Sequence, residues 1–326
     1  MSYYRTLGLV TEPFSTSPDP AFFYGSTEHR AALCRLQISV ALKRGLSVMA
    51  GDIGTGKTTV GRRLSQVLCE DPAVDFRMIL NPYFRTEKQF LSRMAALFHV
   101  PIPNENRATA LDYMEAIEQF LFTAGVEQNR TVVLLIDEAQ ILPDFVFEVL
   151  RILLNYETNQ FKILQLILAG QLELLPRIVA MPNFWDRVAT KVMLKPLDPG
   201  DVRDLIQARL RAAGYTQQTP LFAPDAIDLI HAHTNGLPRR VNILCHNILE
   251  YLVMYDKKRV DEGIVRKVLD RESASDDFKT LVPEPQEALE MPHSQQDQAE
   301  QVEDIRLAAN SAIVGSKGGF LRVVNA

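Results

Sequence analysis

The sequence predicts an α/β fold in which helices sandwich a parallel sheet, followed by a small all-helical lid domain and a disordered tail. Up to about residue 197, short and nearly continuous apolar runs alternate with amphipathic stretches, a pattern typical of a parallel sheet buried on both faces. From Asp201 only helical periodicity remains, and after Glu272 apolar periodicity fades. We therefore expect an N-terminal strap at 1–25, an α/β core at 26–197, a helical lid at 198–272 and an acidic tail at 273–326.

The composition is that of an ordinary globular protein with an uneven charge distribution. The 326 residues are 47% hydrophobic and 23% charged, and the net charge is −5. Residues 273–326 contain 4 basic and 9 acidic residues, so the remainder holds 31 basic (35 less 4) and 31 acidic (40 less 9) residues and is neutral. The body therefore has no global basic signal for nucleic acid, although a local patch is not excluded.

Hydropathy and cysteine usage indicate a cytoplasmic protein without direct membrane insertion. No apolar run approaches the ~20 residues that span a bilayer. The three cysteines, Cys34, Cys69 and Cys245, follow no metal-ligand or disulfide spacing, and we expect them to be small core residues in a reducing compartment.

The individual elements follow from apolar runs and from capping signals. Ser26 can cap a helix that stops at Gly45, and Thr86 with Gln89 has the pattern of a capping box. The expected strands are 46–50, 74–80, 131–136, 162–168 and 190–194. The expected helices are 26–44, 57–69, 86–98, 109–123, 145–155, 201–213, 224–234, 238–254 and 261–271.

A phosphate-binding loop joins the first strand to the helix that follows it. The residues Gly51-Asp52-Ile53-Gly54-Thr55-Gly56-Lys57-Thr58, continued by Thr59, match the pattern G-x-x-x-x-G-K-[ST] between a strand and a helix. Its glycines let backbone N–H groups turn inward around a phosphate, and the helix N-terminus adds its dipole. Lys57 would reach the β- and γ-phosphates and the Thr58 hydroxyl would hold Mg²⁺. This context separates the loop from an ordinary glycine-rich turn and indicates a P-loop NTPase core.

Two carboxylates end the third strand, at the sheet edge where α/β proteins bind ligands. Asp137 would bind the Mg²⁺ water shell. Glu138, pointing the other way along the strand, would polarise an attacking water. An acidic pair at a strand end is common, but about 80 residues downstream of a phosphate loop it becomes specific.

Three further polar residues are candidates for the same site. Gln171 follows the fourth strand and could touch the γ-phosphate or hold the water, unless it is a solvated turn residue. Arg239, after Pro238 at the start of a lid helix, could reach across the interdomain cleft to phosphate oxygens. Arg187 is a candidate for an arginine supplied to a neighbouring subunit, with Arg177 and Lys191 as nearby competitors.

The N-terminal strap is rich in aromatic residues and proline, which do not remain exposed to water in such density. The simpler interpretation is a strap that packs across the core. The alternative is that part of it forms the wall against which an adenine ring stacks.

These motifs together resemble the AAA+ ATPases, and within them the general secretion pathway protein A (ExeA) type. The resemblance covers residues 3–272. It rests on Phe14-Ser15, Pro18-Asp19-Pro20, Tyr24, His29 to Leu33, the loop from Gly51 to Thr59, Leu135 to Gln140, Leu168 to Gln171 and Gly236 to Asn242. The resemblance implies an ATP-dependent homo-oligomeric ring with its site at a subunit interface. In it Arg187 would reach the neighbour's nucleotide, Gln171 would be the first sensor and Arg239 the second.

Three functions remain open on the sequence. The first is an ATPase that hydrolyses ATP to ADP and phosphate and remodels or positions a protein partner, in an envelope or pilus-type machine. The second is a DNA-binding regulator of the type that selects transposition targets. Its candidate DNA-contacting cations lie in short clusters, and such clusters are more often solvated helix ends. Those cations are Lys43, Arg44, Arg62, Arg63, Lys257, Lys258 and Arg259. The third is a slowly hydrolysing scaffold, which the presence of Glu138 disfavours.

Overall fold

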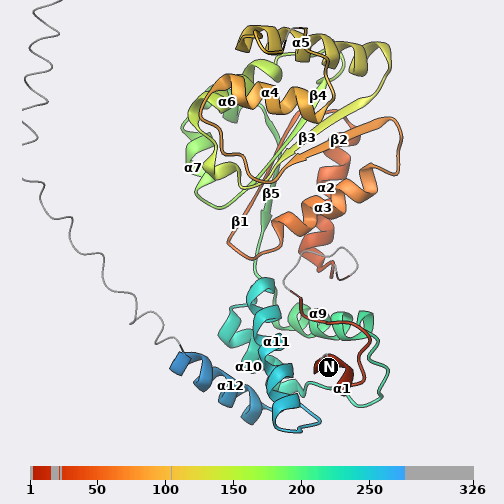
Figure 1. Cartoon of the computed structure of the whole chain (residues 1–326), viewed down its shortest axis with the longest axis vertical. Coiled ribbons are helices and arrows are strands. Elements are labelled where there is room, and N and C mark those ends of the chain that lie inside the picture. The colour runs from red at the N-terminus through yellow and green to blue at the C-terminus, as the bar shows by residue number, and fades with distance from the viewer. Residues whose placement is uncertain (1–2, 16–21, 23, 104, 276–326) are drawn as a thin grey trace, which may run out of the picture. The chain divides into compact units, whose positions relative to one another are not determined.

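The computed structural model describes residues 3–15, 22, 24–103 and 105–275 (Figure 1). The expected acidic tail lies outside these residues from position 276 onward, as do positions 16–21 and 23 of the strap.

A five-stranded, fully parallel sheet forms the core of the first domain and confirms the predicted fold class. The strand order is β2-β3-β4-β1-β5. The strands are β1 (Leu46–Gly51), β2 (Val74–Ile79), β3 (Thr131–Ile136), β4 (Leu164–Gly170) and β5 (Val188–Leu194). Because β1 lies between β4 and β5, its carboxyl end opens near the ends of β3 and β4, and residues that follow these three strands can share one site.

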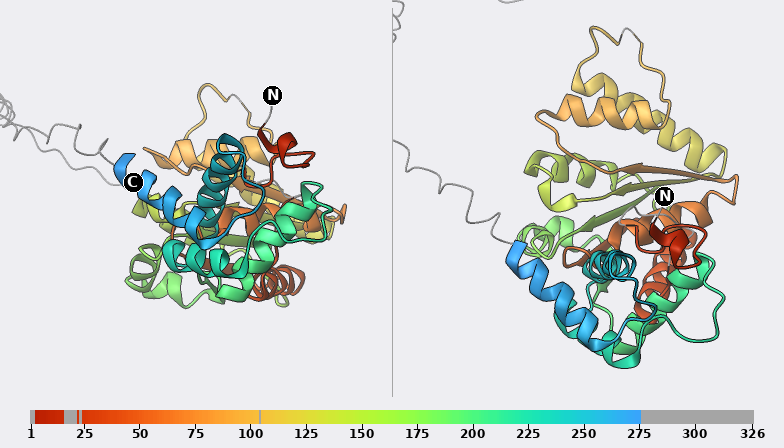
Figure 2. Two further views of the ribbon diagram at one scale, coloured as in Figure 1. Left: turned by 90° about the horizontal axis from the view of Figure 1, so that it is seen from below. Right: turned by 60° about the horizontal axis from the view of Figure 1, so that its bottom comes forward.

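Helices cover both faces of the sheet, as expected for strands that are apolar on both sides. Helices α4 (Glu87–Leu97), α5 (Ala110–Phe122) and α6 (Asp144–Leu153) pack on one face, and α2 (Thr27–Ala41) and α3 (Lys57–Leu68) on the other (Figure 2). Strand β3 shows why: Val132, Leu134 and Ile136 join the first cluster, whereas Val133 and Leu135 join the second. All five are buried.

Side-chain caps fix the starts of several helices. The hydroxyl of Ser26 accepts the N–H of His29 at the start of α2, as predicted. At α4 the Thr86 hydroxyl accepts the N–H of Gln89, but the Gln89 amide oxygen accepts from Arg85 N rather than from Thr86 N. The predicted capping box is therefore only half formed there.

A small helical domain follows the sheet, formed by α9 (Pro199–Ala212), α10 (Pro224–Thr234), α11 (Pro238–Met254) and α12 (Glu262–Ser275). Helix α12 continues three residues beyond the expected end of the lid at 272. The interior of this helical domain is a separate apolar cluster that includes Val202, Ile230 and Ile248.

The described residues of the strap pack on the lid rather than on the sheet. A short helix, α1 (Tyr3–Thr6), lies against α11, and Leu9 and Phe14 are buried in the lid cluster. The backbone continues the contact, because Val10 N donates to Ala213 O at 2.8 Å.

Several features differ from the sequence expectations. Two short helices between β4 and β5, α7 (Leu174–Val179) and α8 (Pro182–Trp185), were not predicted. The expectation that all cysteines are core residues is wrong, since Cys34 and Cys69 are exposed and only Cys245 is buried. Among the described residues, no helix has both the length and the apolar character needed to cross a membrane.

Candidate nucleotide-binding and hydrolysis site

The loop between β1 and α3 requires glycine at three positions for three reasons. Gly54 and Gly56 have positive φ angles of 84° and 98°, which residues with a Cβ rarely adopt. A Cβ on Gly56 would also lie 2.9 Å from His29 Nε2. Gly51 has an ordinary φ, but a Cβ there would lie 2.7 Å from the carbonyl oxygen of Leu194. The loop therefore curls tightly before α3 and is enclosed by β5 and α2.

A buried histidine supports the loop from α2, a role that the sequence analysis missed. His29 Nε2 lies 2.8 Å from the Thr55 carbonyl oxygen, which can only accept, so Nε2 carries the hydrogen. Its Nδ1 lies 2.7 Å from the Ser26 hydroxyl, which can donate to it. Burial lowers the pKa of His29, although the Thr55 carbonyl, Asp201 and Glu28 oppose this. The ring is thus a neutral brace under the loop.

Lys57 is buried at the start of α3 and folds back on the loop. Its Nζ donates to the carbonyl oxygens of Gly51 at 2.8 Å and Asp52 at 2.9 Å. Burial lowers the pKa of Lys57, whereas the nearby carboxylates of Glu138 and Asp137 raise it. An anion in the loop would offer the ammonium group a stronger acceptor than two neutral carbonyls.

Thr58 and Asp137 meet between α3 and the end of β3. The Thr58 hydroxyl donates to Asp137 Oδ2 at 2.6 Å, and Glu138 N donates to Oδ1 at 3.0 Å. Asp137 is 2% exposed, and burial raises its pKa while these two donors lower it. A hydroxyl and a carboxylate in contact are hard oxygen ligands, and Mg²⁺ binds through such ligands. The residues present therefore fit the predicted ion.

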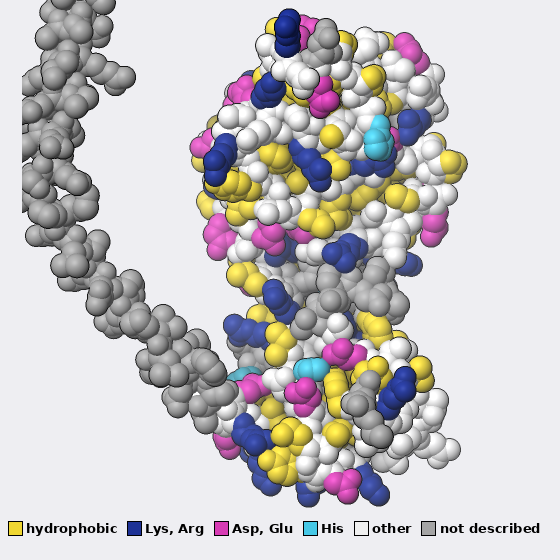
Figure 3. Space-filling view, viewed as in Figure 1, with side chains coloured by type: hydrophobic (Ala, Val, Ile, Leu, Met, Phe, Trp, Pro, Cys, Tyr) yellow, Lys and Arg dark blue, Asp and Glu magenta, His cyan; other side chains and the backbone are white. Residues whose placement is uncertain are grey.

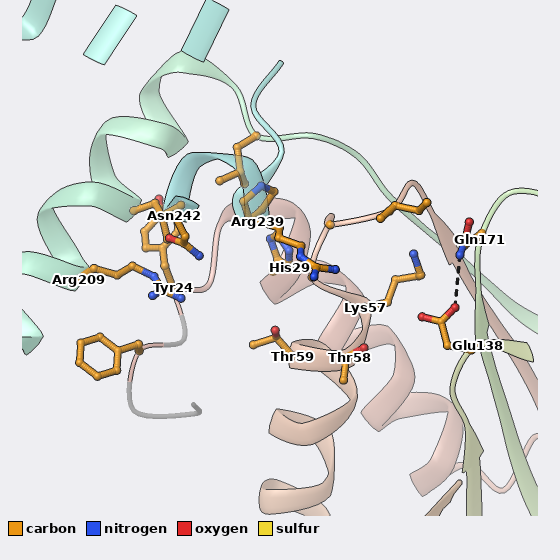
Figure 4. Close-up of a pocket in the computed structure, with 17 residues that line it drawn as sticks. Tyr24, His29, Lys57, Thr58, Thr59, Glu138, Gln171, Arg209, Arg239 and Asn242 are labelled. Atoms are coloured by element: carbon orange, nitrogen blue, oxygen red, sulfur yellow. Dashed lines mark hydrogen bonds between the residues drawn. The ribbon is translucent and has the colours of Figure 1, made fainter. Parts of the chain in front are cut away.

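Glu138 reaches the site by a turn rather than by strand alternation. It lies one residue beyond Asp137, after β3 has ended, and has a positive φ of 53°. The expectation that it points away along the strand is corrected by this geometry. The Gln171 amide donates to Glu138 Oε2 at 3.3 Å, so the end of β4 contacts the end of β3 (Figure 4).

A second glutamine, Gln140, connects these two strand ends more closely. Its Nε2 donates to Glu138 Oε2 at 2.6 Å, and its Oε1 accepts the backbone N–H of Gln171 at 3.0 Å. A Cβ on Gly170 would lie 3.0 Å from that Oε1. Arg177 donates to the Gln140 carbonyl at 2.7 Å and pairs with Asp144. In the sequence Gln140 stands only as the last residue of the Leu135 to Gln140 run, with no role assigned to it.

Helix α11 brings Arg239 to the loop. Arg239 N donates to the Gly54 carbonyl at 3.3 Å, and a Cβ on Gly54 would lie 3.0 Å from Arg239 Cβ. The Arg239 side chain lines a cavity of about 360 Å³ together with Lys57, Thr58, Thr59, Glu138 and Gln171. The structure thus places these predicted site residues around one cavity of a size that holds small-molecule ligands.

The opposite end of the cavity is lined by the strap and the lid. Figure 4 shows Tyr24, Arg209 and Asn242 on the side away from Lys57 and Glu138. Phe22 and Leu205 also line the cavity. The Tyr24 hydroxyl donates to Asp201 of α9 at 3.0 Å, which ties the strap to the lid.

Arg187 does not line this cavity. Its guanidinium donates to Asn155 Oδ1 at 2.7 Å and to the Asn183 carbonyl. Lys191, its competitor, lies 3.7 Å from the Trp185 ring centroid. The described residues of the chain hold no arginine at the Glu138 side of the cavity other than Arg239.

Comparisons with known proteins agree with this arrangement. Residues 41–178 match the AAA domain family. Over 249 residues, 76% of its length, the chain is 35% identical to general secretion pathway protein A of Aeromonas hydrophila. The chain spans less than half of that relative, since the match covers 44% of it.

Solved structures with the same fold share little sequence with the chain. Cdc6p from Pyrobaculum aerophilum superposes with a TM-score of 0.62 at 17% identity, covering 81% of this chain and 72% of that one. The ORC1 protein of Aeropyrum pernix, solved in complex with DNA, gives 0.57 at 18% identity, covering 82% and 70%. The RuvB branch migration motor of Thermotoga maritima gives 0.51 at 16% identity, covering 76% and 69%. Residues 41–178 therefore resemble the AAA domain family, and over 249 residues the chain is similar to general secretion pathway protein A.

Proposed function

We propose that the protein is an ATPase that hydrolyses ATP to ADP and phosphate with Mg²⁺. The observation that carries this proposal is the convergence of Lys57, the Thr58–Asp137 pair and Glu138 at the carboxyl ends of β1 and β3. A phosphate loop alone supports nucleotide binding. A carboxylate that lies beside the two predicted Mg²⁺ ligands, without being one of them, supports hydrolysis.

The residues divide the chemistry among them. The loop N–H groups and Lys57 bind the phosphates, and Arg239 adds a cation from α11. Glu138 accepts a proton from water as the water oxygen bonds to the γ-phosphorus and the bond to the β-phosphate oxygen breaks. Gln140 and Gln171 hold the Glu138 carboxylate by their amide groups. Mg²⁺, held by Thr58 and Asp137, would offset negative charge on the phosphate oxygens.

The protein acts as a cytoplasmic homo-oligomer, in which Arg187 of one subunit serves the nucleotide of the next. The position of Arg187 supports this, because Arg187 does not line the cavity of its own subunit. The partner that the ATPase remodels or positions belongs to a secretion or pilus-type assembly. Similarity to general secretion pathway protein A supports that choice.

DNA binding is the second candidate, favoured by three consecutive exposed cations, Lys257, Lys258 and Arg259, between α11 and α12. The other candidates are scattered: Lys43 lies over the Phe161 ring, and Arg63 donates to Gln66. On the face drawn in Figure 3, basic and acidic side chains are interspersed rather than segregated. Such a surface gives a weaker electrostatic footprint than a basic stripe.

Steady-state ATP hydrolysis and equilibrium ATP binding by the purified protein test the first proposal. Lys57→Ala should lose ATP binding, and Glu138→Gln should bind ATP without hydrolysing it, because an amide cannot accept the proton. Tight ATP binding by Lys57→Ala would refute the loop assignment. Full hydrolysis by Glu138→Gln would assign the base to another residue.

Two further measurements separate the finer proposals. Arg187→Ala and Glu138→Gln chains should each be inactive, and mixing them should restore part of the activity if Arg187 acts between subunits. Arg203→Ala, on the surface of α9, is the matched control. Several-fold stimulation of hydrolysis by double-stranded DNA that fades as salt rises would favour the DNA-binding function. Hydrolysis indifferent to DNA would leave the protein-remodelling function ahead.

A further inference from the structure

A shallow hollow lies between the end of β2 and α4, apart from the nucleotide cavity (Figure 1). Its volume is about 640 Å³. Strand β2 forms one edge of the described sheet, so the hollow lies at that edge. The residues that line it are Asn81, Tyr83, Phe84, Arg85, Gln89 and Arg93. None of these six residues lines the nucleotide cavity, and the hollow therefore has another use.

The loop that forms one wall of this hollow is held in place by contacts with α4. The Phe84 ring packs edge-on against the buried ring of Phe90, with the two centroids 5.2 Å apart. Arg85 N donates to Gln89 Oε1 at 2.8 Å, and Gln89 N donates to Thr86 Oγ1 at 3.2 Å. The backbone that carries the Arg85 side chain is therefore fixed against the helix.

Two guanidinium groups in the hollow have no partner within the described part of the chain. Arg85 and Arg93 are exposed, and neither side chain forms an ion pair or a hydrogen bond with a described residue. Elsewhere on the same strand the arrangement differs, because Arg77 and Arg130 both pair with Asp75. A guanidinium group is weakly hydrated and binds carboxylates with two parallel hydrogen bonds. The two arginines are thus available to an anionic partner.

The surroundings of the two arginines indicate the class of that partner. Tyr83 is 67% exposed, and Leu80 at the start of the loop is 48% exposed. Tyrosine and arginine are enriched in protein–protein interfaces and among the residues that contribute most to binding. Nucleic acid binding at physiological salt depends on several phosphate contacts, whereas the lining of the hollow contains two cations. The composition therefore favours a protein segment.

We propose that this hollow is the docking surface for an acidic segment of a protein partner, in which carboxylates flank an aromatic or large aliphatic side chain. The carboxylates pair with Arg85 and Arg93, and the apolar side chain packs on Tyr83. The inference rests on the proposed function, because it names the chemistry of the partner that the ATPase remodels or positions. Docking itself requires no hydrolysis, so the two proposals can be tested separately.

The hollow is connected to the hydrolysis site through the end of β2. Asp137 N donates to the carbonyl oxygen of Ile79 at 2.8 Å, and Ile79 precedes Asn81 by two positions. Asp137 also accepts the hydroxyl of Thr58. A segment that shifts the loop after Ile79 therefore acts on the strand end that positions Asp137. We expect a bound segment to change kcat for ATP hydrolysis more than KM.

Fluorescence anisotropy on the full chain without nucleotide tests the docking. The probe is a short labelled peptide in which pairs of glutamates flank a phenylalanine, and one control peptide carries lysine at every glutamate. The chain should bind the probe at least about tenfold more tightly than this control, because like charges repel. Replacing the phenylalanine of the probe by alanine should also weaken binding, since the contact with Tyr83 is lost.

A pair of double variants shows whether the two arginines are responsible. Arg85→Ala with Arg93→Ala should weaken binding of the probe roughly 3- to 30-fold, the range expected for two exposed ion pairs. Arg203→Ala with Arg211→Ala removes the same charge from exposed positions of α9 and should leave the affinity within about twofold. Unchanged thermal midpoints verify that the exposed substitutions leave the fold intact. Equal weakening by both double variants, or equal affinity for the glutamate and lysine peptides, would overturn the proposal.

Two further results separate this proposal from its alternatives. A labelled single-stranded oligonucleotide that binds more tightly than the peptide, and is lost with Arg85 and Arg93, would assign the hollow to nucleic acid and overturn the proposal. ATP hydrolysis is then measured with and without the probe. Hydrolysis by a chain that does not bind the probe would overturn the docking and leave the ATPase function in place. Probe binding by a chain that does not hydrolyse ATP would support the docking and refute the ATPase function.

Discussion

Replacing Gln140 tests whether the Glu138 carboxylate must be held in place for hydrolysis. Gln140→Leu keeps a similar volume but removes the 2.6 Å hydrogen bond to Glu138 Oε2 and the acceptor for Gln171 N. A hydrogen bond to a charged group contributes ~1.5–3 kcal/mol. If that energy is lost only in the transition state, kcat falls roughly 10- to 150-fold. Gln171 still donates at 3.3 Å, so activity should not vanish.

The assay is steady-state ATP hydrolysis with separate determination of kcat and KM. KM should change by less than about threefold, because Gln140 does not line the cavity. Gln140→Glu should lower kcat further, since it places a second negative charge beside Glu138. Gln128→Leu, at an exposed position, is the matched control.

A double-mutant cycle separates positioning from a general loss of structure. In a Glu138→Gln background, Gln140→Leu should not lower the small residual rate of ATP hydrolysis any further, because the two residues act through one carboxylate. Additive losses in the double variant, or a kcat within twofold of the full chain for Gln140→Leu alone, would refute the reasoning.

Three other predictions concern stability and reactivity. Burial lowers the pKa of His29, so on acidification the unfolded chain binds a proton at this residue before the folded chain does. The contribution of His29 to the free energy of unfolding should therefore be complete above about pH 6.5 and be lost as pH drops through the lower folded pKa. His29→Gln should flatten this part of a plot of unfolding midpoint against pH. Gly236→Ala should reduce the free energy of unfolding by ~2–4 kcal/mol in urea titrations. Its Cβ would lie 2.0 Å from the Leu197 carbonyl oxygen, and the backbone there has a φ of +66°. Gly263→Ala in α12 is the control and should be neutral or slightly stabilising. Thiol reagents should modify Cys34 and Cys69 in the folded protein and Cys245 only after unfolding, since Cys245 is buried and burial raises its pKa; three reactive thiols under native conditions would contradict the lid packing.

The sequence could predict what depends on local patterns. The strands of the sheet centre are apolar on both faces, so β3 lies at the predicted residues 131–136. The edge strand β5 was predicted two residues too short, because exposed Ala189 and Lys191 alternate with buried neighbours and interrupt the apolar run. The phosphate loop is likewise local, since its turn, glycines and helix start are contiguous.

The remaining parts of the site depend on contacts between distant segments. His29 supports Thr55 across 26 residues, and Gln140 contacts Gln171 across 31. A histidine in an amphipathic helix and a glutamine after a strand carry no distinctive local signal. Asn242 follows the predicted Arg239 by three residues, yet only the structure shows that its amide oxygen is buried and has no hydrogen-bond donor among the described residues.

The lid is built from two separate segments of the chain, the strap and the helices from α9 onward. Leu9 and Phe14 are buried among helices that begin at residue 199, and the Tyr3 hydroxyl lies 2.8 Å from His246 Nδ1 across 243 positions. During synthesis the first residues emerge long before their binding surface exists, so the lid interior closes only after α11 has been made. Contacts of such sequence separation are slow to form. A chain that begins at Ser26 would retain the whole sheet but expose an apolar hollow on the lid, which makes aggregation during folding the expected defect of that truncation.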